Sequence, residues 1–153
     1  MSVVVAKFGG SSLADAEQII KMKNIVLADK NRRYIVPSAP GKRHADDEKI
    51  TDLLYELHDE PEKESCGAYR KILERFSQIR DRLGLKTEIE KHIAEILDRL
   101  REGASVDYAA SRGEYLNGLL IADLLGFDFI DPAGVIFFDG DGAYDHAKTV
   151  AVL

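Results

Sequence analysis

The sequence contains a single cysteine, and it contains no long apolar run. One cysteine excludes an intrachain disulfide, and the charged, helix-forming surroundings of Cys66 predict a small residue on a helix rather than a catalytic pair. No stretch of about 18 consecutive apolar residues occurs, which argues against a membrane-spanning helix. The N-terminus "MSVVVAK" lacks a basic leader followed by an apolar region. We therefore expect a protein of the reducing cytoplasm.

An excess of positive charge is also lacking. Lysine and arginine total 21 against 27 for aspartate and glutamate, the net charge is -6, and no dense Lys/Arg block is present. Nucleic acid and anionic membranes are therefore not expected as partners. With 45% hydrophobic and 31% charged residues, the composition is that of an ordinary globular protein. The length of 153 residues fits one domain or half of a larger one.

The N-terminal part has the pattern of a β-α-β unit. Residues 2–6 contain the uninterrupted β-branched run "VVV", which predicts a central strand buried on both faces of a parallel sheet. A helix is expected to start near Ser12 or Asp15, and residues 34–36 form a second short strand. Pro37 then breaks the pattern and predicts an irregular loop.

Helical spacing dominates the rest of the chain. In residues 46–60 the apolar positions Ile50, Leu53, Leu54 and Leu57 predict an amphipathic helix, with acidic residues at the favourable end of its dipole. Apolar positions at helical spacing also line residues 69–76 and 89–100, so residues 61–103 should contain a helical hairpin that packs against its own domain. A further helix is predicted over 105–125, ending at Gly126, and one or two strands over 127–138. The order β-α-β-α-(αα)-α-β defines an α/β class.

The stretch "VVVAKFGGSS" places a cation at the end of a predicted strand. A buried cation is costly unless an anion meets Lys7. Gly9 and Gly10 permit close backbone approach, and Ser11 supplies a hydroxyl. These features suit a phosphate, and they also suit an ordinary turn from strand to helix, so these residues alone leave both open.

The loop after the second predicted strand contains a Gly-Lys pair at 41–42. A Walker motif would need glycine where Val36 stands and Ser or Thr where Arg43 stands, so that motif is excluded. Ligands of open parallel sheets bind beyond the carboxyl ends of the strands. Ser38 and Thr51 could supply hydroxyls there, or serve only as cap and turn residues.

The stretch "SRGEYLNG" forms a polar or small row on its helix, because Ser111, Glu114 and Gly118 are spaced i, i+3 and i+7. An apolar stripe is expected beside it, through Tyr115, Leu119 and Ala122. A carboxylate on such a row could receive an ammonium group. The alternative is a solvated surface glutamate.

Two metal sites are excluded by the pattern. "DGDGAYD" has Ala143 where a third calcium ligand should stand and Val150 where a bidentate glutamate should stand, so a turn is expected. The histidines have no i, i+4 pair and no cysteine partners, which argues against zinc. We predict no metal-binding residues.

Taken together, "KFGGSS", "SAPGKR" with "KITDLL", and "SRGEYLNG" resemble, in order and spacing, the N-terminal half of the aspartate kinases in the amino acid kinase family. The resemblance implies a three-layer α/β/α fold with a mainly parallel sheet, of which residues 1–153 form the amino-acid-substrate lobe. The hairpin of residues 61–103 is then an insertion. The implied activity is ATP-dependent phosphorylation of the L-aspartate β-carboxylate to 4-phospho-L-aspartate, the first step of lysine, threonine and methionine biosynthesis.

The resemblance also implies residue roles. Lys7 is the catalytic residue, which contacts the transferring phosphoryl group. The other implied site residues are Gly9, Gly10 and Ser11 at the ATP phosphates, and Ser38, Thr51 and Glu114 at the amino acid, with Glu114 on its α-ammonium. L-Aspartate and ATP with Mg²⁺ are the implied substrates, no tightly bound cofactor is implied, and a homo-oligomer is expected.

The sequence departs from the family in what it lacks. The Gly-rich R-G-G-S-D segment, a further lysine and the pair of ACT modules do not occur in it. The substrate-carboxylate arginine belongs to that segment, so Arg112 is not assigned its role. We therefore expect this lobe to be inactive by itself and to expose a sheet edge that favours self-association. The alternatives are an acylglutamate or glutamate kinase, or a non-catalytic binding module.

Overall fold

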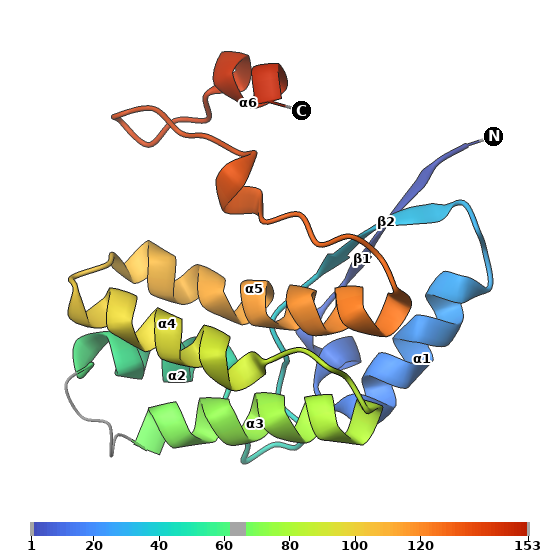
Figure 1. Cartoon of the computed structure of the whole chain (residues 1–153), viewed down its shortest axis with the longest axis horizontal. Helices are drawn as coiled ribbons and strands as arrows, with labels where there is room; N and C mark the ends of the chain where they lie inside the picture. The colour runs from blue at the N-terminus through green and yellow to red at the C-terminus, as the bar shows by residue number, and fades with distance from the viewer. Residues whose placement is uncertain (1, 62–66, 153) are drawn as a thin grey trace.

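A computed structural model describes residues 2–61 and 67–152 (Figure 1). Strands β1 (Val4–Phe8) and β2 (Arg32–Pro37) pair in parallel, with Val5 opposite Tyr34 and Lys7 opposite Val36. The predicted β-α-β unit is therefore confirmed, although β1 lies two residues later than expected. Cys66, predicted on a helix, lies outside the described residues.

The prediction that the first strand is buried on both faces is wrong. On one face, Phe8 and Ile35 pack against the hydrophobic core. On the other face, Val5 is 63% exposed and Val36 is 49% exposed. Burial of both faces needs a packed layer on each side, and the described residues supply that layer on only one side.

The helix after β1 begins with a cap. A 3₁₀ turn, η1 (Gly10–Leu13), leads to α1 (Ala16–Leu27), whose N-cap Asp15 accepts a hydrogen bond from the Gln18 N–H at 2.9 Å. This bond satisfies one of the free N–H groups of the first helical turn and places the start of the helix at the second of the two predicted positions.

The other predicted helices are confirmed. They are α2 (Ile50–Asp59), α3 (Gly67–Leu83), α4 (Ile89–Arg101) and α5 (Val106–Leu125). Gly126 ends α5 with φ of 66°, a left-handed conformation that glycine adopts without steric cost.

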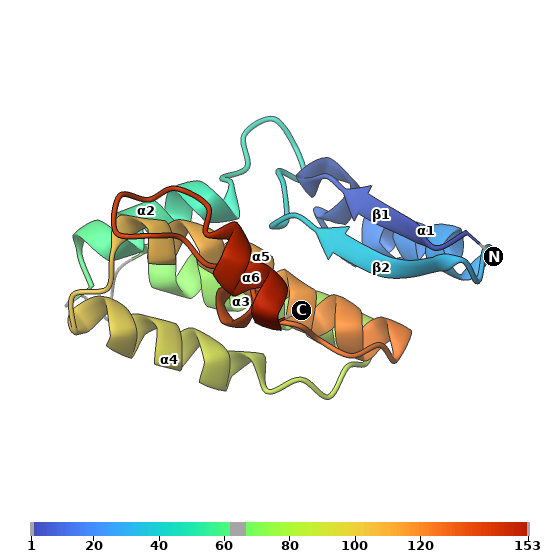
Figure 2. The same cartoon turned by 90° about the horizontal axis from the view of Figure 1, so that it is seen from above.

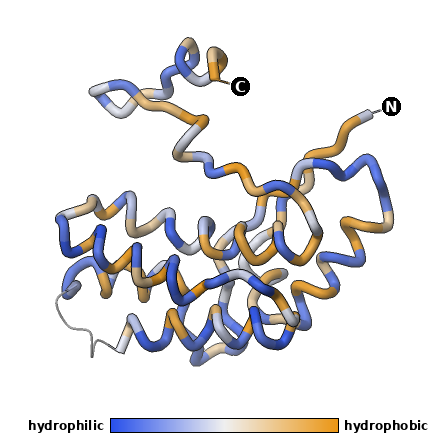
Figure 3. Tube along the Cα trace, viewed as in Figure 1, coloured by the Kyte–Doolittle hydropathy of each residue, from blue (hydrophilic) through white to orange (hydrophobic). Residues whose placement is uncertain are grey.

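The α3–α4 hairpin packs on the rest of the chain, as predicted. Helix α2 contacts α3 and α5, and α4 contacts both α3 and α5, which closes a ring around a common core (Figures 1 and 2). Apolar and polar stretches alternate along these helices (Figure 3), and most of their buried positions are apolar. Among the core side chains are Leu54, Ile72, Phe76, Ile93 and Leu116.

The segment after α5 differs from its prediction. Between residues 127 and 152 the structure has no strand; it has a 3₁₀ turn, η2 (Pro132–Gly134), and one isolated antiparallel bridge between Phe138 and Tyr144. Helix α6 (His146–Val152) follows and was not predicted. A strand needs a partner for its backbone groups, and in Figure 2 this segment runs apart from the β1–β2 pair.

Candidate functional site

The loops after β1 and β2 meet backbone to backbone. The Gly41 N–H donates to the Gly10 carbonyl at 2.9 Å, and the Ser38 N–H donates to the Phe8 carbonyl at 3.0 Å. A Cβ on Gly41 would lie 2.7 Å from the Gly10 carbonyl carbon. Only glycine at position 41 permits this approach, so the two loops form one continuous surface beyond the carboxyl ends of the strands.

A cavity of about 390 Å³ lies at this junction. We call residues 38–47, which connect β2 to the region before α2, the pocket loop. The cavity brings together four residues that the motifs predicted: Gly10, Ser11, Ser38 and Thr51. Its other lining residues are Ala39, Pro40, Gly41, Lys42 and Lys49.

Lys42 and Lys49 were missed as site residues. Lys42 donates to the Ala45 carbonyl at 3.3 Å, and both side chains belong to exposed residues. The Gly-Lys pair does not fit a Walker motif. Its position in a loop directly after a strand was the signal that could have assigned Lys42 to this cavity.

Helix α5 holds one peptide group of the pocket loop from both ends. Glu114 Oε1 accepts hydrogen bonds from the Ala39 N–H at 3.1 Å and from Ser38 Oγ at 3.4 Å. Asn117, one turn later and wholly buried, donates from Nδ2 to the Ser38 carbonyl at 2.7 Å. The Ser38–Ala39 peptide is therefore fixed in orientation at the wall of the cavity. Asn117 was not predicted; its place one turn after Glu114 was the available signal.

Lys7 and Gly9 do not line this cavity. Lys7 is an exposed residue near the end of β1. Its backbone pairs with Val36 of β2, and its ammonium group has no hydrogen bond or ion pair with residues 2–61 or 67–152. Gly9 precedes η1 in an extended conformation. Both lie next in the chain to Phe8 and Gly10, so the structure places them at the same strand end as the cavity without bringing them into its wall.

The buried face of α5 differs from the apolar stripe that the sequence predicted for this helix. Its buried positions include Ala109, Gly113, Leu116 and Leu120, whereas Tyr115, Leu119 and Ala122 are only half-buried. Helix α5 packs against α2 and α4 at once, so two of its faces are covered, and a single stripe cannot describe it. Gly118, expected on the polar row, is buried against the Phe129 ring.

Arg112 contacts side chains of its own helix. Its guanidinium lies over the Tyr108 ring at 4.4 Å and the Tyr115 ring at 4.9 Å, and it donates to Ser111 Oγ. The side chain that makes these contacts is largely buried.

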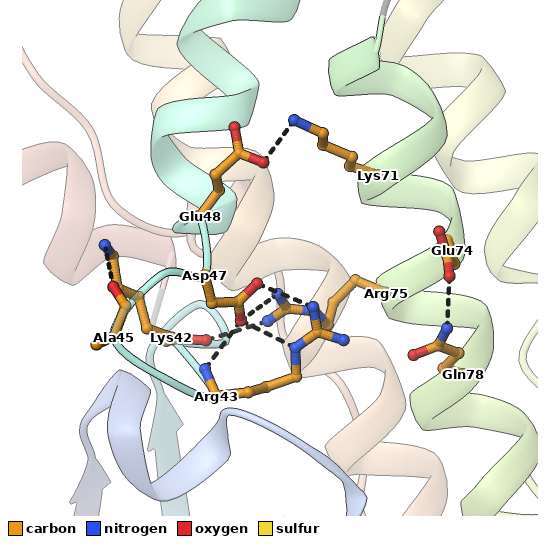
Figure 4. A network of polar contacts seen from close by, with 10 residues as sticks. Lys42, Arg43, Ala45, Asp47, Glu48, Lys71, Glu74, Arg75 and Gln78 are labelled. Carbon is orange, nitrogen blue, oxygen red and sulfur yellow. Dashed lines mark hydrogen bonds and ion pairs between the residues drawn. The ribbon is translucent and has the colours of Figure 1, made fainter.

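Asp47 ties the far end of the pocket loop to α3 (Figure 4). Its carboxylate accepts hydrogen bonds from the Arg43 backbone N–H and guanidinium at 2.9 Å, and from Arg75 Nη2 at 2.6 Å. These bonds, those of Arg43 foremost, hold the pKa of Asp47 well below its usual range. Asp47 is one of the acidic residues that the sequence placed near the N-terminal end of α2, and in the structure it pairs with two arginines.

We expect the Asp47→Asn variant to lose on the order of 2 to 4 kcal/mol of unfolding free energy at pH 7, because Arg75 then lacks its buried counterion. The unfolded carboxyl has a pKa of about 3.9, above that of the native one, so the unfolded chain binds the proton first as the pH falls. The contribution of the Asp47 carboxylate to the free energy of unfolding is therefore fully present above about pH 5 and is lost progressively below about pH 4.

Urea denaturation of both proteins between pH 3 and pH 7 measures this effect. The difference in unfolding free energy between wild type and Asp47→Asn should shrink toward pH 3. A difference that stays constant with pH would mean that Asp47 does not titrate at a lowered pKa.

Two further classes of site are absent from the described part of the chain. It contains no group of three or more His, Cys, Asp or Glu side chains placed to hold a metal ion. Within the same residues, no helix combines the length and the apolar character that a membrane span requires.

The fold is that of a known family. Residues 2–150 match the amino acid kinase family, and the chain belongs to it. Its relatives include the aspartokinases: it is 37% identical over 131 residues to Aspartokinase 3 of Bacillus subtilis (strain 168), covering 77% of this chain and 28% of that protein. It is 34% identical over 137 residues to the lysine-sensitive aspartokinase 3 of Escherichia coli (strain K12), covering 80% of this chain and 28% of that one.

Solved structures of aspartate kinases have the same fold. The aspartate kinase of Clostridium acetobutylicum superposes with a TM-score of 0.92 at 45% identity, covering 99% of this chain and 35% of that one. E. coli aspartokinase III in complex with aspartate and ADP gives a TM-score of 0.76 at 26% identity, over 99% of this chain and 36% of that one. The resemblance seen in the sequence motifs is thereby confirmed. The chain spans about a third of the length of these relatives.

Proposed function

We propose that this chain is the amino-acid-substrate lobe of an aspartate kinase, which transfers the γ-phosphoryl group of ATP to the β-carboxylate of L-aspartate. One observation carries the proposal. Gly10, Ser11, Ser38 and Thr51, chosen from separate motifs, line one cavity at the strand ends of a chain that superposes on an aspartate kinase with a TM-score of 0.92.

The cavity and the strand end beside it carry groups suited to both substrates. Phosphoryl transfer depends on alignment and charge stabilisation, which the Lys7 ammonium and the backbone of Gly9 and Gly10 are suited to provide at the phosphates. On the amino-acid side, Ser38 and Thr51 supply hydroxyls. Lys42 and Lys49 add positive charge to a site that must accept anions.

Glu114 is proposed to pair with the α-ammonium of aspartate. Its Oε1 holds the pocket loop, and its Oε2 accepts no hydrogen bond from the residues that the structure describes. A carboxylate with one oxygen fixed by the protein and the other available is a suitable partner for an ammonium group.

The proposed reaction also needs a nucleotide with its metal ion. The E. coli relative was solved with ADP and aspartate together, which supports a nucleotide as co-substrate here. We propose that Mg²⁺ arrives as the ATP complex, bridging phosphate oxygens. The nucleotide base and the substrate carboxylate would then be held by parts of the protein beyond this lobe.

The exposed face of the sheet carries apolar side chains, which favours a further layer of protein packed against it. Val3, Val5, Tyr34 and Val36 are each about half exposed or more, between 49% and 63%. We propose that the remainder of a three-layer kinase domain covers this face, that the complete protein is a homo-oligomer, and that it works in the cytoplasm.

An assay of ADP release with aspartate, ATP and Mg²⁺ tests the function. By itself the 153-residue chain should show no turnover above background, because it supplies one wall of the site. A chimera in which this chain replaces the matching N-terminal third of the Clostridium acetobutylicum enzyme should release ADP only when aspartate is present. Circular dichroism and size-exclusion chromatography would establish that both proteins fold.

Each alternative gives a different result in this assay. ADP release with glutamate or an acylglutamate, but not with aspartate, would favour another amino acid kinase. A folded chimera without activity on any of these substrates would favour a non-catalytic module. Turnover by the chain alone would contradict the assignment as one lobe.

A further inference from the structure

The pocket loop is held from outside the site by one buried side chain of α3. Arg75 is only 5% exposed. Its Nη1 donates to the Gly41 carbonyl at 3.1 Å, and its Nη2 donates to Asp47 Oδ2 at 2.6 Å. One guanidinium therefore binds the pocket loop at Gly41, near its start, and at Asp47, its last residue. Figure 4 shows the contacts with Asp47.

Gly41 is the residue through which the pocket loop touches the glycine pair. Its N–H donates to the Gly10 carbonyl, and its own carbonyl accepts from Arg75. Gly10 and Gly41 both line the cavity. A continuous path of hydrogen bonds thus runs from α3 through Gly41 to the loop that follows β1.

Stability alone does not explain this arginine. Burial lowers the pKa of Arg75, and its Nε is buried without a hydrogen-bond partner among the described atoms. Burying a guanidinium is costly, and apolar residues of similar size often replace buried ion pairs without loss of stability. What the arginine provides, and an apolar residue cannot, is a rigid fork that holds a carbonyl and a carboxylate at fixed positions.

A second ion pair of α3 can be compared with the contacts of Arg75. One turn before Arg75, Lys71 Nζ lies 2.5 Å from Glu48 Oε2, and both of these side chains are 49% exposed. This ion pair joins the same helix to the residue after the pocket loop, and neither Lys71 nor Glu48 lines the cavity. Exposed pairs of this kind contribute little to stability.

We propose that Arg75 is a positioning residue, which fixes Gly41 and so sets the shape of the cavity for phosphate and amino acid. The proposal rests on the proposed function for the identity of those ligands. It assigns the helical hairpin a role in the site, although neither of its helices supplies a cavity-lining residue.

Amide hydrogen exchange on the full 153-residue chain tests the positioning directly. Lysine at position 75 keeps the charge but cannot hold both acceptors in one plane. In the Arg75→Lys variant the Gly41 amide should exchange about 10-fold faster or more, while core amides of α5 keep their rates. The matched control, Lys71→Met, should leave the Gly41 rate unchanged.

Three results would overturn the proposal. They are an unchanged Gly41 rate in Arg75→Lys, a parallel increase at Gly41 and throughout α5, and a variant that does not fold. The last two would show a purely structural role. Because exchange is measured without substrate, these outcomes do not depend on kinase activity.

The chimera adds a functional measurement. Arg75→Lys should lower kcat/KM for aspartate by about 10-fold or more, with the melting temperature close to that of Lys71→Met. An unchanged kcat/KM together with a faster Gly41 amide would overturn the link to the cavity. An inactive wild-type chimera would instead count against the proposed function, and the exchange data would still decide the role of Arg75.

Discussion

Replacing Lys7 with alanine in the chimera should lower kcat for aspartate phosphorylation by about 10²-fold or more, the scale of losing one preorganised donor. The KM for aspartate should change little. Lys7 is exposed near the end of β1, and its ammonium group has no hydrogen bond or ion pair in the described part of the protein, so the alanine variant breaks no polar contact of the side chain. Its charge is therefore available to stabilise the phosphoryl group in the transition state. Steady-state kinetics at saturating ATP measures both constants.

Lys21→Ala is the matched control for this substitution. Lys21 is an exposed lysine of α1, and it does not line the cavity. Its replacement should leave kcat unchanged. If Lys7→Ala retains a kcat near that of wild type, the lysine is merely structural, and the phosphate site must be assigned elsewhere.

Replacing Glu114 with glutamine should raise the KM for aspartate by about 10- to 100-fold, as expected for the loss of a charged hydrogen-bond partner. The KM for ATP should stay nearly constant. Glutamine keeps an Oε1 acceptor for the Ala39 N–H, so the pocket loop should retain its position while the charge facing the ammonium is lost. Kinetics with each substrate varied in turn separates the two KM values.

The control for this variant is Glu102→Gln, at the end of α4, where the glutamate is exposed and lines no part of the cavity. It should leave both KM values unchanged. A Glu114→Gln variant whose loss is confined to ATP would reverse the assignment of the two sides of the site.

Helices were predictable because their signal is local. Leu53, Leu54 and Leu57 recur at helical spacing in α2, and all three are buried in the structure. The end of α5 at Gly126 was also local, because a left-handed residue favours glycine whatever surrounds it. The parallel pairing of β1 and β2 followed from one intervening helix.

Two features depend on distant parts of the chain and not on local sequence: whether each face of the sheet is buried, and whether residues 127–138 form a strand. A β-branched run shows that a strand can be buried, but the exposure of Val5 depends on whether another layer packs on its face. In the same way "FDFIDPAGVIFF" has strand-like residues, but a strand also requires a neighbouring strand to accept its hydrogen bonds.

The sequence by itself determined the fold class, the helices and the motif residues, because chain spacing and local backbone preference decide them. It named Gly10, Ser11, Ser38, Thr51 and Glu114 one by one, and their roles stay predictions. Only the tertiary structure decided that the first four line one cavity, that Asn117 and Glu114 hold one peptide group, and that Arg75 reaches Gly41 from α3. Arg75 and Gly41 are 34 positions apart, and a contact at that separation leaves no periodic trace, because it depends on how helices and loops pack in space.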